Sequence, residues 1–108
     1  MTNIEKRIER DVFRIMRHKL KGKNSEVELK CWRMVKVAKV IFSRFGVFPY
    51  QIKLKHLVWY FDVVMFWDIE IPTSSQYRYY LAIKGFVECL EKWGHWKGYI
   101  IARRPVPR

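Results

Sequence analysis

Apolar residues between positions 27 and 45 recur every three or four residues, and this period constrains the fold more than any other feature of the sequence. Residues spaced in this way share one face of an α-helix, here as a stripe about 120° wide. Ser25 and Glu28 stand at the spacing of a capping box, and Gly46 is a natural helix terminator. The pattern predicts a helix over residues 25–45. Its stripe consists of Val27, Cys31, Met34, Val35, Ala38, Ile41, Phe42 and Phe45.

The N-terminal segment has the same period, and Thr2 and Glu5 form another capping-box spacing. We expect a first amphipathic helix from this point to about Leu20. Its apolar positions are Ile4, Ile8, Val12 and Ile15. Trp32 and Val40 fall outside the stripe of the second helix, which indicates that a second element, such as the first helix, packs there. The arc away from the stripe is basic and carries Lys30, Arg33, Lys36, Lys39 and Arg44.

The segment after Pro49 admits two interpretations. Tyr50, Ile52 and Leu54 alternate with polar residues as in a strand, but alternation over five residues is weak evidence. A helix is favoured, with a core side made of Ile52, His56, Trp59, Tyr60 and Val63. Beyond it, residues 67–71 alternate between apolar and acidic side chains up to Pro72, and this pattern predicts a strand.

A third capping-box spacing, Thr73 with Gln76, begins a helix that is predicted to run to Trp93, where Gly94 stops it. Its core face is expected to hold Tyr79, Ala82, Ile83, Phe86, Leu90 and Trp93, and its other face Tyr77, Arg78, Tyr80, Leu81, Lys84, Gly85 and Glu88. Residues 99–102 then indicate a short strand, paired antiparallel with residues 67–71. A basic tail follows at residues 105–108. The predicted fold is a single domain, mainly α with a small antiparallel β element.

Charge narrows the possible partners. The chain of 108 residues carries 22 Lys and Arg against 10 Asp and Glu, a formal net charge of +12. Self-repulsion of this size opposes compaction and favours a polyanionic partner, most commonly nucleic acid. The alternative is that Lys-rich surfaces merely keep an aromatic-rich chain in solution, as in proteins of thermophiles.

The order of elements over residues 50–104 resembles winged helix-turn-helix DNA-binding domains. The likeness rests on a helix with His56 and Trp59, the capped helix from Thr73, and a glycine-to-strand ending. That ending reads Leu90, Glu91, Lys92, Trp93, Gly94 and then residues 99–104. In this chain the connection over residues 62–72 is long for the turn, and only one wing strand is obvious. The domain would divide into a helical pair at residues 1–46, a helix-turn-helix with a wing at residues 50–104, and the tail.

This resemblance implies that the capped helix enters the major groove of duplex DNA and that the wing contacts the backbone or the minor groove. The candidate nucleic-acid-binding residues are Ser74, Ser75, Gln76, Tyr77, Arg78, Lys84, Arg103 and Arg104. Plainer interpretations stay open: serines and glutamine are common at any helix start, and exposed tyrosines are also typical of a homodimer surface.

Catalytic and metal-binding patterns are lacking, so we expect neither an enzyme nor a cofactor, a metal or a small-molecule substrate. His18, His56 and His95 are far apart in sequence, and none stands at a ligand spacing from another histidine or a cysteine. Cys31 and Cys89 are expected in the core, and whether they pair is left open.

Membrane and secretion signals are also lacking, and a cytoplasmic location is expected. The apolar run of residues 57–67 is interrupted by Asp62 and is too short to span a bilayer. The leading functional hypothesis is duplex DNA binding by a transcriptional regulator. The alternatives are a protein-interaction module that forms homo-oligomers, and RNA binding.

Overall fold

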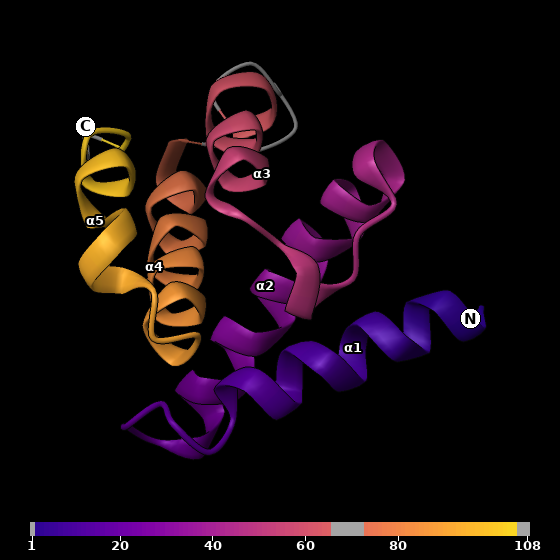
Figure 1. The fold of residues 1–108 in the computed structure, drawn as a ribbon. Coiled ribbons are helices and arrows are strands. Elements are labelled where there is room, and N and C mark those ends of the chain that lie inside the picture. The colour runs from indigo at the N-terminus through magenta and orange to yellow at the C-terminus, as the bar shows by residue number, and fades with distance from the viewer. Residues whose placement is uncertain (1, 66–72, 106–108) are drawn as a thin grey trace.

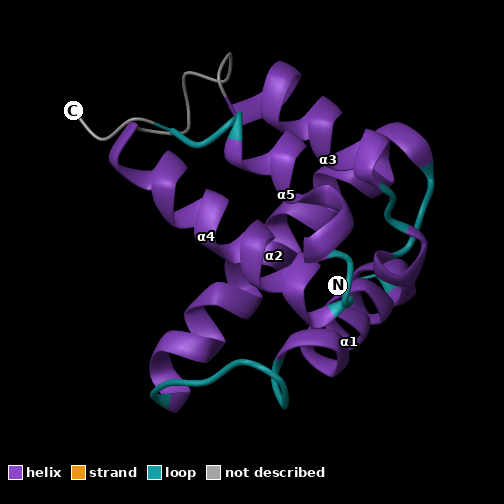
Figure 2. Ribbon diagram, turned by 60° about the vertical axis from the view of Figure 1, so that its left-hand side comes forward, coloured by secondary structure: helices purple, strands orange, loops and turns teal. Residues whose placement is uncertain are grey.

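The computed structural model describes residues 2–65 and 73–105, and its regular elements in this part of the chain are all helical (Figures 1 and 2). They are α1 (Asn3–Met16), α2 (Asn24–Phe45), the 3₁₀ turn η1 (Pro49–Gln51), α3 (Leu54–Trp59), the π-helical segment η2 (Tyr60–Met65), α4 (Thr73–Cys89) and α5 (Trp93–Ile101). Buried side chains from all five α-helices meet in one core cluster. None of the described helices is long and apolar enough to cross a bilayer.

The apolar period correctly predicts the first two helices, and these form an antiparallel pair (Figure 1). The Thr2 hydroxyl accepts a hydrogen bond from the Glu5 N–H at 3.1 Å and so caps α1. The α1 helix ends at Met16, earlier than the predicted Leu20. The α2 helix ends at Gly46, whose φ of 69° is the left-handed conformation that glycine adopts without strain.

The predicted capping box of Ser25 and Glu28 is wrong. The N-cap of α2 is Lys23, which makes no side-chain capping bond. Glu28 instead lies 3.7 Å from Arg17, measured from Oε1 to Nη2, and links α2 to the end of α1. An acidic residue at this spacing therefore serves the contact between the two helices rather than the helix start.

The first helix packs against α2 on the side that Trp32 predicts. The ring of Phe13 meets that of Trp32 edge to face at 5.0 Å between centroids. The Nζ of Lys39 lies 3.5 Å from a carboxylate oxygen of Glu9 and 3.8 Å from one of Glu5. Lys39 thus faces α1 instead of solvent.

The helical interpretation of residues 52–63 is confirmed over most of its length by α3 and η2. His56 is buried as expected, but Val63 is 51% exposed. The reason is the π-helical segment, whose wider turns shift the angular position of each following residue. Phe61 and Met65 are buried in place of Val63.

The α4 helix packs against α1, α2 and α5. More of its circumference is therefore buried than a single apolar stripe predicts. Ala82, Ile83 and Phe86 are buried as expected. Tyr80 and Gly85, which the helical wheel assigns to the outer face, are buried too. A Cβ on Gly85 would lie 3.3 Å from Cδ2 of Leu20, so the α1–α2 turn rests directly on this glycine.

The predicted strand over residues 99–102, and with it the winged-helix fold, is wrong. The α4 helix ends at Cys89 and not at Trp93, because Glu91 takes a left-handed φ of 62° and the Lys92 N–H donates to the Val87 carbonyl. The chain then forms α5, with Gly94 inside it. Trp93, Trp96 and Ile100 point to the core at helical spacing, a pattern that overrides a run of four strand-like residues.

No strand occurs in residues 2–65 or 73–105, so the predicted antiparallel β element finds no counterpart there. The other predicted strand, residues 67–71, lies outside the described residues, as do residues 106–108 of the predicted tail. Pro105, where that tail was expected to begin, is buried. Cys31 and Cys89 are both buried free thiols.

Truncation of Phe86, which is fully buried in α4, should remove a central part of the core. We expect Phe86→Ala to lower the free energy of unfolding by about 3 to 5 kcal/mol, through lost burial and the cavity left behind. Urea denaturation measures the change. Val63→Ala, at an exposed apolar position, should stay within about 0.5 kcal/mol of the wild type. Equal losses in the two variants would contradict the packing described here.

Acid should destabilise the fold through His56. Burial, and next Lys55 and Lys53, hold the pKa of His56 below the ordinary value of 6.5. Its Nδ1 accepts the Lys53 N–H at 2.9 Å, which needs the neutral ring. The unfolded chain therefore binds more protons, and the free energy of unfolding should fall as the pH drops below about 6.5, by at most about 1.4 kcal/mol per pH unit.

Urea denaturation at pH values from about 8 to about 5, in steps of about one pH unit, tests this expectation, because histidine titrates in this range. His56→Gln keeps an acceptor for the Lys53 N–H but does not titrate, so its stability should depend less on pH. His95→Gln, at an exposed position of α5, is the matched control and should follow the wild type. An unchanged pH dependence in His56→Gln would exclude this role of the imidazole.

Candidate nucleic-acid interface

The outer face of α1 carries a row of cations. Ile8, Val12 and Ile15 are buried against the rest of the molecule, which turns the opposite arc of the helix to solvent. We call the exposed basic residues on this arc the α1 ridge. They are Lys6, Arg7, Arg10, Arg14 and Arg17. At 1.5 Å per residue the ridge is about 16 Å long.

The carboxylates of α1 take part in ion pairs within the protein. The side chain of Asp11 is only 6% exposed and lies 3.9 Å from Arg7 and 3.7 Å from Arg10, each measured from Oδ to Nε. Glu5 and Glu9 pair with Lys39 of α2. In the described part of the chain no carboxylate is ion-paired with Lys6 or Arg14. Glu28 of α2, which is half exposed, pairs with Arg17. Lys6 and Arg14 are therefore the ridge cations whose charge is not balanced by an ion pair in the described residues.

An exposed tryptophan borders the ridge. Trp32 of α2 is 47% exposed and stands against Phe13 of α1. The two rings form part of a shallow groove of about 420 Å³, whose lining residues are Lys6, Glu9, Arg10, Phe13, Arg17 and Trp32. An accessible indole between cations can stack on a base or a sugar while the cations hold phosphates.

The residues predicted at the start of α4 are not all free to bind a partner. Ser74 is exposed and Ser75 is partly exposed. Gln76 donates a hydrogen bond from Nε2 to the Met65 carbonyl at 2.9 Å, which ties α4 to the end of η2. Its side chain therefore has a structural partner already.

The predicted aromatic and basic residues of α4 form separate contacts. Tyr77 accepts a hydrogen bond through its hydroxyl from Nη2 of Arg104 at 3.1 Å, and the guanidinium lies 5.3 Å from the Tyr77 ring centroid. The Lys84 ammonium lies 5.3 Å from the centroid of the Trp93 ring. Arg78 is exposed and forms no ion pair with residues 2–65 or 73–105.

Arg103 is engaged in contacts within the protein. Its Nε and Nη2 lie 2.9 and 3.3 Å from the two carboxylate oxygens of Asp62, and its Nη1 donates to the Tyr99 carbonyl at 2.8 Å. A bidentate pair of this kind neutralises the cation and fixes α5 against η2. Of the predicted binding residues, the fold brings Tyr77 and Arg104 together. Arg103 instead contacts Asp62. Lys84 lies about 15 Å along α4 from Ser74, at 1.5 Å per residue.

The α1 ridge was missing from the sequence-based prediction, although its signal is present. Arg7, Arg10, Arg14 and Arg17 stand three or four residues apart, with Lys6 next to Arg7. All five are out of phase with Ile4, Ile8, Val12 and Ile15. The period predicts a solvent-facing basic surface on the second helix. Lys36 and Arg44 are exposed there, but Lys39 faces α1 and Lys30 lines a pocket. The exposure of Trp32 depends on how two helices pack, which the period alone does not give.

The described residues contain no group of three or more His, Cys, Asp or Glu side chains that could hold a metal ion. Comparisons with protein-family models, with curated proteins and with solved structures each find no match to this chain.

The Arg103–Asp62 pair should act as a structural link. In a double-mutant cycle of Arg103→Ala and Asp62→Ala, we expect a coupling free energy of about 0.5 to 1 kcal/mol, near the upper end for partly exposed ion pairs because the geometry is bidentate. Urea denaturation of the four proteins measures it. Additive effects of the two substitutions would mean that the pair does not hold α5 to η2.

Proposed function

We propose that this protein binds nucleic acid, with duplex DNA as the preferred form, through the phosphates that the α1 ridge contacts. The observation that carries the proposal is the row of five exposed cations on α1, of which Lys6 and Arg14 have no ion-pair partner among the described residues. Four of the five are arginines, whose planar guanidinium groups can bind phosphate oxygens in pairs.

Phosphate binding also gives a reason for the formal net charge of +12. Each phosphate that a cation neutralises releases condensed counterions from the duplex, and this entropy gain favours binding at low salt. Contacts of this kind carry no base information. Sequence preference, where it exists, would come from side chains that reach base edges, and the exposed candidates for this role on α4 are Ser74 and Arg78. DNA binding would also agree with the cytoplasmic location expected from the sequence.

A second candidate is binding to single-stranded RNA or DNA, and the exposed indole of Trp32 favours it. Unpaired bases stack on accessible aromatic rings, and each such contact contributes about 1 to 3 kcal/mol. Competition between duplex and single-stranded probes of equal length separates the two candidates. Trp32→Ala should weaken only the single-stranded complex if the second candidate is correct.

The salt dependence of DNA affinity tests the proposal directly. Fluorescence anisotropy with a labelled duplex should give a log–log slope of affinity against salt near −5, as expected for about six phosphate contacts. Lys6→Gln with Arg14→Gln removes two ridge cations that have no carboxylate partner among the described residues and should make the slope less negative by about 1.8. No binding at low salt would disprove the proposed function.

A matched pair controls for net charge. Lys55→Gln with Lys97→Gln removes the same charge from exposed positions of α3 and α5 and should leave the slope nearly unchanged. Equal losses in the two double variants would show that affinity follows net charge and not the ridge.

The α4 surface is tested separately by Arg78→Ala and Lys84→Ala. If α4 also contacts DNA, Arg78→Ala should weaken binding while leaving urea denaturation within about 0.5 kcal/mol of the wild type, because the side chain is exposed. Lys84 is partly buried beside Trp93, so loss of stability in Lys84→Ala would mark it as a packing residue instead.

A further inference from the structure

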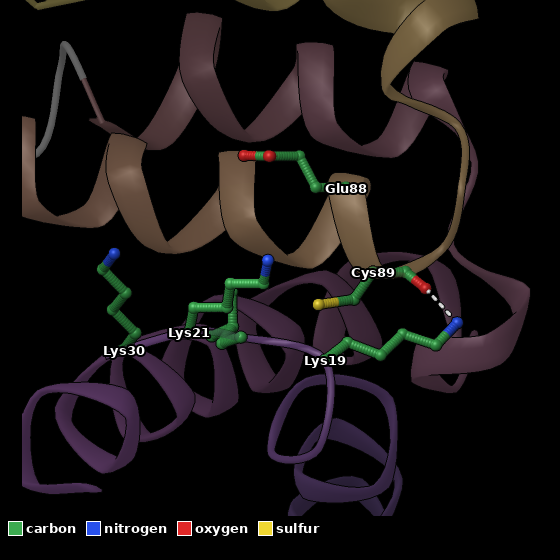
Figure 3. Close-up of a pocket in the computed structure, with 6 residues that line it drawn as sticks. Lys19, Lys21, Lys30, Glu88 and Cys89 are labelled. Atoms are coloured by element: carbon green, nitrogen blue, oxygen red, sulfur yellow. Dashed lines mark hydrogen bonds between the residues drawn. The ribbon is translucent and has the colours of Figure 1, made fainter. Parts of the chain in front are cut away.

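Three lysines line a pocket at the end of the molecule where the α1–α2 turn meets α4 (Figure 3). The pocket holds about 460 Å³. Its lining residues are Lys19, Leu20, Lys21, Lys30, Glu88 and Cys89. The lysines come from two elements, since Lys19 and Lys21 belong to the turn and Lys30 to α2. Cavities of this size accommodate small organic ligands.

Lys19 has partners within the protein. Its Nζ donates to the Cys89 carbonyl at 3.0 Å and lies 3.7 Å from a carboxylate oxygen of Glu91. It therefore closes one side of the pocket and fixes the turn to the end of α4.

Lys21 and Lys30 differ from Lys19 in this respect. Neither forms an ion pair with a carboxylate of residues 2–65 or 73–105. Figure 3 shows both side chains rising toward α4 from the α1–α2 end. Lys21 is exposed and Lys30 is partly exposed. Two ammonium groups that line one pocket repel each other, and an anion bound between them would offset this repulsion.

The surroundings of these lysines are fixed and mostly neutral. The Leu20 side chain lies against Gly85, at 3.3 Å from where a Cβ would stand, so the turn between Lys19 and Lys21 is seated on α4. Burial raises the pKa of the Cys89 thiol, which therefore stays protonated. Glu88 is the one carboxylate of the lining and contributes less negative charge than the lysines contribute positive charge.

We propose that this pocket binds a phosphate monoester dianion, either the terminal phosphate of a nucleic-acid strand or that of a free mononucleotide. A monoester carries a charge of about −1.5 to −2 at neutral pH, which two ammonium groups can balance, whereas an internal phosphodiester carries one. Lysine ammonium groups act as point charges and place no geometric demand on the phosphate. The strand-end source rests on the proposed nucleic-acid binding, and the mononucleotide source does not.

The strand-end source is tested with two labelled duplexes that differ only in a 5′-phosphate or a 5′-hydroxyl. The wild type should bind the phosphorylated duplex about three- to tenfold more tightly, the combined effect of two exposed ion pairs. Lys21→Gln with Lys30→Gln should abolish this preference. Lys55→Gln with Lys97→Gln, which removes the same charge elsewhere, should retain it.

The mononucleotide source is tested by calorimetric titration of the protein with AMP and with adenosine. AMP should bind, adenosine should not, and the variant Lys21→Gln with Lys30→Gln should lose AMP binding. A preference for the phosphorylated duplex assigns the strand end, and AMP binding without that preference assigns the free nucleotide. Absence of both would overturn the pocket proposal.

Glu88→Gln provides a test of opposite sign. Removing the only carboxylate of the lining should strengthen binding of whichever phosphate probe is bound, by about two- to fivefold. Weaker binding in this variant would contradict the pocket, even if the lysine variants folded poorly. Failure of the 5′-hydroxyl duplex to bind at low salt would disprove the proposed function alone, because the AMP titration does not depend on DNA.

Discussion

The packing of α4 against α1, α2 and α5 is the contact on which the rest of the structure depends. It buries Ile83 and Phe86 and brings Leu20 close to Gly85, where an added Cβ would lie 3.3 Å from the Leu20 side chain. By seating the α1–α2 turn on α4, this contact also determines where Lys19 and Lys21 stand. The same close approach that completes the core therefore forms the wall of the lysine pocket.

The helices could be predicted from the sequence where the apolar period is long. The α2 helix and the burial of Ile8, Val12 and Ile15 in α1 follow from the apolar stripes, whereas Ile4 of the same stripe is 45% exposed. The prediction of secondary structure was wrong where the apolar pattern covers only a few residues. Tyr99 to Ala102 are four residues that a strand and a helix explain equally well. Of the four only Ile100 is buried, and it joins Trp93 and Trp96 at the core at helical spacing. The resemblance to winged helix-turn-helix domains led to the prediction of a wing in this segment, because the order of the preceding elements matched.

The candidate site was harder to predict than the fold, since it depends on partners and not on period. Sequence alone placed Arg103 among the DNA contacts, but Asp62, 41 positions away, pairs with it. Gln76 looked like a free amide at a helix start, but its partner is a carbonyl of η2. The exposed residues Ser74 and Arg78 keep their predicted availability. Contacts between residues distant in sequence remove a charge or an amide from the binding surface, and no local pattern reports them.

The packing of the core determines where the charged side chains lie on the surface. The acidic residues that pair in the described chain mostly join two elements, as Glu9 does with Lys39 and Glu28 with Arg17. With 10 carboxylates for 22 cations, the remaining cations have no internal counterion, and the phase of each helix decides where they gather. On α1, burial of Ile8 and Val12 puts Lys6 and Arg14 on the outer face.

A change that rotated α1 would expose its apolar stripe and bury the ridge together, so substitutions in the α1 core would lower stability and phosphate affinity at once. Substitutions on the ridge alone separate the two effects, since the exposed ends of these side chains contribute little to the core.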